Sequence, residues 1–217
     1  MTFKMKEGEG AMETSILEDQ IVEQLKGMCD WLQKKTCYDD YLIRLLDLIG
    51  ATMVGVKPAE LLNIPVNEGG TKNLALEELR VYFLRDKNIK LREIKTQNGR
   101  VQVLFYHSTS LDNALCNKVN LKFLRGLGYP QQYSVEGYVN YLVTRLNKKD
   151  FPHEIGLFLG YPLKDVLGYI GHPSLKLVKI NGWKIYGNDK LSNKRYESFL
   201  QARIKVREFI YPVANYH

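Results

Sequence analysis

Two Asn-Gly dipeptides constrain the fold more than any other feature, because each lies between two runs of alternating apolar and polar residues. Asn98-Gly99 separates LREIKTQ from RVQVLFYHS, and Asn181-Gly182 separates LKLVKI from WKIYG. Asn and Gly tolerate the positive φ angles of a type I′ turn, whose twist matches that of two paired strands. We therefore expect two β-hairpins that together build one small antiparallel or mixed sheet.

Helical periodicity, with apolar residues three or four positions apart, occupies most of the remaining chain. It predicts an α+β fold in which helices cover the sheet and a helical corner is inserted between the two hairpins. This corner is Phe151–Ile170, where Gly160-Tyr161-Pro162 joins two short helices. We expect the last, basic helix to cover the sheet, residues 1–12 to form a flexible leader, and residues 13–217 to form one domain. The expected helices span about 13–35, 40–50, 74–87, 112–127, 134–147, 154–159, 163–170 and 191–210.

The composition is that of an ordinary globular protein, with 45% hydrophobic and 25% charged residues in a chain of 217. No apolar run approaches the length of about 18 residues that a membrane span needs, and the N-terminus lacks the apolar core of a secretory signal. We therefore expect a soluble, cytoplasmic protein without membrane contact. The three cysteines, Cys29, Cys37 and Cys116, lack metal-binding spacing, so we expect reduced thiols and predict neither a metal site nor a cofactor.

The corner has features of two functional motifs and completes neither. Its two helices have helix-turn-helix spacing, but the second offers Lys164 and no Arg, Asn or Gln suited to base edges. The dipeptide His153-Glu154 begins a zinc-binding HExxH motif, but Leu157 stands where the second His belongs. Two interpretations stay open: an architectural joint in which Glu154 favours the helix dipole, and a contact site for a ligand or partner.

Polar and aromatic residues around the corner are the candidate binding residues. Tyrosines and a tryptophan gather near the corner, the second hairpin and the last helix, where they form either a stacking surface or ordinary packing with hydroxyls at the surface. The chain has no nucleophile motif, no P-loop and no dinucleotide-binding glycine motif, so no catalytic residues are predicted. The candidates for contacting a ligand or partner are His153, Glu154, Tyr161, Asp165, Trp183, Tyr186 and Lys57.

Positive charge is concentrated near the C-terminus. The net charge is +7, and residues 176–208 include nine basic and three acidic side chains. Such a region suits an acidic partner, RNA or DNA included, and a solvated basic helix face is the alternative interpretation. The candidate nucleic-acid contacts are Lys184, Lys190, Lys194, Arg195, Arg203, Lys205 and Arg207.

The segment FPHEIGLFLGYPLKDVLGYI, followed by GWKIYG, resembles the signature of an uncharacterised family, domain of unknown function 3793, from Gram-positive anaerobes of low GC content and some viruses. The similarity extends upstream through GVKPAELLNI, VQVLFYHS and FLRGLGY, and covers about residues 42–200. The family pattern has a His-Cys pair where this chain has Leu48 and Ile49, and a later Cys, whereas none follows Cys116 here. The resemblance implies no activity. Members of the family are often encoded near flavodoxin or iron-uptake genes, so the resemblance implies a link to redox or iron physiology.

Three functions from different classes are compatible with these observations. The leading hypothesis is a non-enzymatic binding or regulatory protein that engages a protein or small ligand through His153, Glu154 and the Trp183 hairpin. The second is a nucleic-acid-binding or phage-type inhibitory protein that uses the basic C-terminal region. The third is a small redox or iron-associated accessory enzyme with its pocket at the same corner.

Overall fold

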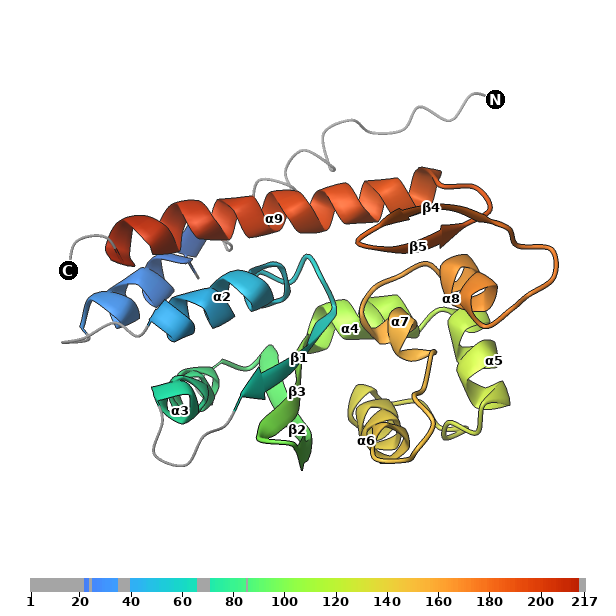
Figure 1. Cartoon of the computed structure of the whole chain (residues 1–217), viewed down its shortest axis with the longest axis horizontal. Helices are drawn as coiled ribbons and strands as arrows, with labels where there is room; N and C mark the ends of the chain where they lie inside the picture. The colour runs from blue at the N-terminus through green and yellow to red at the C-terminus, as the bar shows by residue number, and fades with distance from the viewer. Residues whose placement is uncertain (1–21, 24, 35–39, 66–70, 85, 215–217) are drawn as a thin grey trace, which may run out of the picture.

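The computed structural model describes residues 22–23, 25–34, 40–65, 71–84 and 86–214. It confirms the α+β class, with helices around two small antiparallel sheets (Figure 1). The predicted leader and the start of the first predicted helix lie outside the described residues, and residues 25–33 of that helix are helical. No helix in the described part of the chain has both the length and the apolar character needed to cross a bilayer. In chain order the elements are α2 (Asp40–Met53), β1 (Ala59–Pro65), α3 (Thr71–Phe83), β2 (Ile89–Gln97), β3 (Arg100–His107), α4 (Ser108–Leu115), α5 (Lys118–Gly126), α6 (Val135–Leu146), α7 (Ile155–Phe158), α8 (Leu163–Tyr169), β4 (Leu177–Asn181), β5 (Trp183–Tyr186) and α9 (Lys190–Ala214).

The three-stranded sheet has the order β1-β3-β2, and every neighbouring pair is antiparallel. Gln97 pairs with Arg100 across Asn98 and Gly99, whose φ angles of 51° and 66° are those of a type I′ turn. The place beside β3 is taken by β1, which ends at Pro65. Proline suits this position because a strand at the edge of a sheet does not need every backbone donor.

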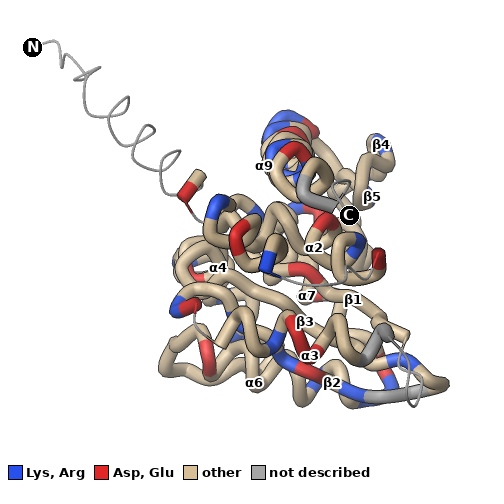
Figure 2. The backbone as a smooth tube through the Cα atoms, turned by 90° about the vertical axis from the view of Figure 1, so that its left-hand side faces the viewer, with Lys and Arg blue, Asp and Glu red and all other residues tan. Residues whose placement is uncertain are grey.

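The second hairpin forms a sheet of its own. β4 and β5 pair on either side of Gly182, which has a φ of 71°. The hairpin projects beside α9 and does not join the three strands (Figure 2). The prediction of one sheet containing both hairpins is therefore wrong: within the described residues β4 and β5 pair only with each other, and β5 packs against α8.

The central strand β3 has both faces buried and divides the interior into two hydrophobic cores. Val103 and Phe105 point into a core shared with α2, α3 and α9. Leu104 and Tyr106 point the other way, into a core formed with α4 to α8. Side chains alternate between the two faces of a strand, so one continuous apolar run supplies both layers. The two layers lie on opposite sides of the sheet in Figure 1.

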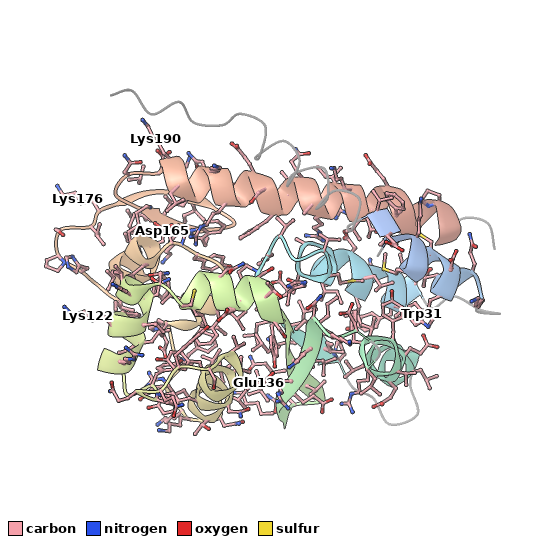
Figure 3. All side chains as sticks on the ribbon, turned by 180° about the vertical axis from the view of Figure 1, so that it is seen from behind. Trp31, Lys122, Glu136, Asp165, Lys176 and Lys190 are labelled. Carbon is pink, nitrogen blue, oxygen red and sulfur yellow. The ribbon has the colours of Figure 1, made fainter. Side chains whose placement is uncertain are left out.

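Glu136 fixes α6 to the outer surface of the sheet (Figure 3). Its carboxylate accepts hydrogen bonds from Lys90 Nζ at 2.5 Å and Arg92 Nη2 at 3.0 Å, both on β2. The hydroxyl of Tyr106 on β3 donates to the same carboxylate at 3.1 Å. One side chain thus holds the helix that precedes the corner against two strands.

The predicted helix over 112–127 is two helices. Asn117 adopts an extended conformation, and its side chain accepts a hydrogen bond from the amide of Asn120 at 2.9 Å. This is an N-cap, which begins a new helix by satisfying an otherwise unpaired amide. The break separates α4 from α5 and lets the chain change direction before it reaches α6.

α9 packs mainly along α2, and not on the sheet as predicted (Figure 1). Gly50, the predicted end of α2, lies within that helix, which continues to Met53. A Cβ atom on Gly50 would lie 3.0 Å from Cγ1 of Val206 on α9. Glycine at this position therefore lets the two helices approach closely, and its effect on packing outweighs its tendency to end helices.

Asp47 on α2 is buried between two arginines of α9. Arg203 donates to it from Nε at 3.1 Å and Nη2 at 2.7 Å, and Arg207 donates from Nε at 2.5 Å and Nη2 at 2.8 Å. Burial alone would raise the pKa of Asp47. The hydrogen bonds and charges of Arg207 and Arg203 outweigh that effect and lower the pKa from 3.8 to about 2. Two of the arginines predicted to contact nucleic acid thus serve to join helices.

Replacing Asp47 by Asn should lower the free energy of unfolding by about 2 kcal/mol at pH 7, since hydrogen bonds to a charged group contribute about 1.5–3 kcal/mol. The folded-state pKa is below the unfolded one, so this contribution is present above about pH 4 and is lost as the pH falls towards 2. The variant should therefore lose less stability than the wild type over that interval. Urea unfolding followed by circular dichroism measures both effects, with Glu197→Gln, an exposed acid on α9, as control. Equal losses for the two variants would contradict the assignment.

Candidate functional site

The turn between α7 and α8 is fixed by contacts from two distant segments. Gly160 has a φ of 86°, and a Cβ there would lie 2.7 Å from Cδ of Pro58 and 3.0 Å from Cζ of Phe199. Arg195 on α9 donates from Nη1 to the carbonyl of Gly160 at 2.6 Å. Only glycine readily adopts this positive φ angle and also has no Cβ to clash with Pro58 and Phe199. The turn therefore packs closely against the start of β1 and against α9.

Asp165 on α8 accepts hydrogen bonds from three elements, although it is only 2% exposed. Lys164 Nζ and the amide of Tyr186 donate to Oδ1 at 2.6 and 2.9 Å. The indole Nε1 of Trp183 and the hydroxyl of Ser192 donate to Oδ2 at 2.8 and 2.6 Å. Burial raises the pKa of Asp165, but the bonds from Lys164, Ser192 and Trp183 outweigh it and lower the pKa. The carboxylate is therefore ionised at neutral pH and joins α8 to β5 and α9 (Figure 3).

The face of α8 that a helix-turn-helix would offer to DNA is covered by β5. Lys164 reaches the carbonyl of Tyr186 and the hydroxyl of Ser192, each at 2.8 Å, in addition to Asp165. Gly168 lies so close to β5 that a Cβ would overlap the ring of Tyr186. In this structure α8 packs against β5, and its helix-turn-helix spacing does not create a base-reading surface.

Glu154 and His153 are neighbours in sequence but have different surroundings. Glu154 is 3% exposed and forms an ion pair with Arg145, Nε to Oε1 at 2.5 Å. The hydroxyl of Tyr129 donates to Oε1 at 3.2 Å, and burial, followed by the charge of Glu154, raises the pKa of that tyrosine. Glu154 precedes α7 without capping it by a side-chain hydrogen bond. It is an internal group that holds α6 and the loop before it, whereas His153 is exposed.

A pocket of about 280 Å³ lies at the corner, between β1, α7, α8 and β5. Its walls are largely apolar, with aromatic and aliphatic side chains. Tyr161 stacks on Trp183, with centroids 4.4 Å apart and planes at 16°. His153 meets Tyr169 edge to face at 4.9 Å, and Lys184 Nζ lies 5.2 Å from the centroid of Tyr169. The lining residues are Leu61, Phe151, His153, Ile155, Gly156, Leu159, Tyr161, Asp165, Val166, Tyr169, Trp183 and Lys184.

Residues 45–216 match the family model described as "Protein of unknown function (DUF3793)". The chain belongs to this family. The matched range begins within α2 and continues past the end of α9, and so includes both sheets, the corner and the pocket. No curated protein and no solved structure matches the chain.

The structure brings four of the predicted candidates of this DUF3793 protein together in the pocket: His153, Tyr161, Asp165 and Trp183. Glu154 is not among the lining residues, and the amide of Tyr186 is bonded to Asp165. Lys57 also lies outside the lining and pairs with Glu60 at 2.5 Å. Part of the pocket was not predicted from the sequence, although most of its residues belong to the segments that carry the family resemblance. The missed lining residues are Leu61, Phe151, Ile155, Gly156, Leu159, Val166 and Tyr169, and Lys184 was assigned to nucleic acid.

The basic residues predicted to contact nucleic acid do not act as one set. Arg195 is bonded to Gly160, and Arg203 and Arg207 are bonded to Asp47. Lys184 lines the pocket. The remaining three, which are exposed on α9, are Lys190, Lys194 and Lys205.

The described cysteines lie apart from the pocket lining. The thiol of Cys29 donates to the carbonyl of Phe209 at 3.3 Å, and burial, then the charge of Asp30, raises its pKa. Cys116 is exposed after α4, and Cys37 lies outside the described residues. Within the described ranges, no three His, Cys, Asp or Glu side chains come together as ligands for a metal ion.

Replacing Gly168 by Ala should reduce the free energy of unfolding by about 2 kcal/mol, because overpacking in a fixed interior costs roughly 1–3 kcal/mol. The new methyl group would overlap Tyr186 and push α8 away from β5. Gly126→Ala is the matched control, since no atom lies within 4 Å of its Cβ position. That control should leave stability unchanged or raise it by about 0.5 kcal/mol. Chemical denaturation of both variants checks the difference, and equal stability would show that α8 is not held against β5.

Proposed function

We propose that this DUF3793 protein is a cytoplasmic, non-enzymatic binding protein with a regulatory role, and that the corner pocket receives an apolar group of a protein or small-ligand partner. The observation that carries the proposal is the pocket itself, a largely apolar cavity beside the polar joint that Asp165 forms with Lys164, Trp183, Tyr186 and Ser192. Ligand sites are typically concave, apolar and already formed, with a few polar groups that fix orientation. His153 and Lys184 supply such groups here.

The hydrogen bonds and ion pair of the two acidic residues at the corner favour a binding function over a catalytic one. Asp165 receives four hydrogen bonds, and Glu154 is paired with Arg145 and Tyr129. A carboxylate used as a general base needs a reachable lone pair and a pKa near the working pH. Asp165 has its oxygens occupied and its pKa lowered, which is the pattern of a structural anion.

The two other hypotheses draw less support from the same residues. Nucleic-acid binding through α9 would have to rely on its exposed lysines, because Arg195, Arg203 and Arg207 have internal partners. A redox or iron role would use thiols or a set of metal ligands. The pocket lining contains no cysteine, both oxygens of its Asp165 carboxylate are hydrogen-bonded, and His153 is its one imidazole. We therefore rank pocket binding first.

The fluorescent anion 8-anilinonaphthalene-1-sulfonate should bind the folded protein with one-to-one stoichiometry. Tyr169→Ala should weaken this binding about tenfold, since an aromatic contact contributes roughly 0.5–1.5 kcal/mol beyond its buried area. Tyr169 is 49% exposed, so its removal should leave thermal stability nearly unchanged. Titration monitored by fluorescence measures the affinity, and thermal unfolding confirms that each variant is folded.

Tyr211→Ala is the matched control, because Tyr211 is 41% exposed on α9 and is not part of the pocket. It should bind the probe as the wild type does. If both variants bind equally, or if the wild type binds no probe, the pocket is not a binding site and the proposal fails.

A further inference from the structure

The apolar surface at the corner extends beyond the pocket. Phe151 and Tyr169, which line the mouth, are 50% and 49% exposed. Ile180 on β4 is 69% exposed and pairs directly with Lys184, so its side chain lies on the same face of the hairpin as that lysine. We call Phe151, Tyr169, Ile180 and Lys184 the pocket rim.

A rim of this kind fits a macromolecular partner better than a free small molecule. A ligand that fills about 280 Å³ would leave Ile180 in water, because that residue is outside the lining. Contiguous exposed apolar side chains commonly mark contact surfaces between proteins. Protein interfaces concentrate binding energy where one large side chain enters a pocket and surrounding contacts exclude water. The pocket and its rim have this arrangement.

The charge around the rim selects an acidic partner. Residues 171–194 contain five lysines and one acidic residue, Asp189. That acid is already paired with Lys179, Nζ to Oδ2 at 3.1 Å. Lys176 and Lys190 are exposed at the end of the molecule that also holds Asp165 (Figure 3). Opposite charge on a partner would speed association and fix its orientation.

From these observations, and resting on the proposed function, we infer that the pocket accepts one aromatic or long aliphatic side chain of an acidic segment in a partner protein. The apolar side chain enters between Phe151 and Tyr169. Asp or Glu residues on either side of it face Lys184 and the neighbouring lysines, while the segment covers Ile180.

Selection from a displayed library of random twelve-residue peptides on the full chain tests this inference. The enriched peptides should contain one Trp, Phe or Leu flanked by at least two Asp or Glu residues. A synthetic peptide of the enriched sequence should lose about tenfold or more in affinity for Ile180→Glu and for Lys184→Glu, measured by fluorescence anisotropy. Leu84→Glu is the control, because Leu84 is 82% exposed just after α3 and outside the rim, and it should bind as the wild type does.

The outcomes separate this inference from the proposed function. The inference would be overturned if the enriched peptides contained no acidic residues. It would also be overturned if Ile180→Glu and Lys184→Glu left the affinity for the peptide unchanged. So would tighter binding to phosphatidylserine vesicles or to a single-stranded RNA oligonucleotide than to any selected peptide. If no peptide is enriched while 8-anilinonaphthalene-1-sulfonate still binds and depends on Tyr169, the inference fails and the pocket remains a binding site. If the probe does not bind either, both fail.

Discussion

The buried carboxylate of Asp165 is the interaction on which the corner depends. It gathers a lysine and a backbone amide on one oxygen, and an indole and a hydroxyl on the other, from α8, β5 and the first turn of α9. A buried charge is tolerated only when its lone pairs are satisfied, and removing one partner leaves the others without compensation. These partners come from three elements, so one carboxylate links the corner, the second hairpin and α9.

This joint also determines the shape of the pocket. The bond from Trp183 to Asp165 holds the indole where Tyr161 can stack on it, and the stack forms one wall. Gly160 holds the other end of the corner against Pro58 and Phe199. A cavity with walls fixed in this way needs little reorganisation when a partner enters, which lowers the entropic cost of binding. The architectural and the binding interpretations of the corner are therefore compatible. The buried hydrogen bonds of Asp165 hold the side chains that form the apolar pocket at the surface.

The features that the sequence predicted well are those with local causes. Asn98-Gly99 determines a turn through its own φ preferences, and Ser134 caps α6 by accepting from the amide of Gly137, three residues away. The features it predicted poorly depend on distant partners. The second hairpin is separate from the first sheet and is held by α8 through Asp165, and Gly50 lies inside a helix where it packs closely against Val206 of α9. Local pattern also could not show that Glu154 is buried with Tyr129 and Arg145 while His153 is exposed, since burial is a property of the assembled layers.

The two indole N–H signals in an NMR spectrum of the ¹⁵N-labelled protein test most directly whether the hydrogen bonds of Asp165 hold the wall of an open pocket. Trp183 and Trp31 are the two tryptophans, and Trp31 packs on Tyr82 at the opposite end of the molecule (Figure 3), so Trp31→Phe assigns both signals. The Trp183 signal should exchange slowly with solvent, because its N–H is bonded to Asp165. It should also shift when 8-anilinonaphthalene-1-sulfonate is added, while the Trp31 signal should not. A Trp183 signal that exchanges freely and does not respond to the probe would contradict both expectations.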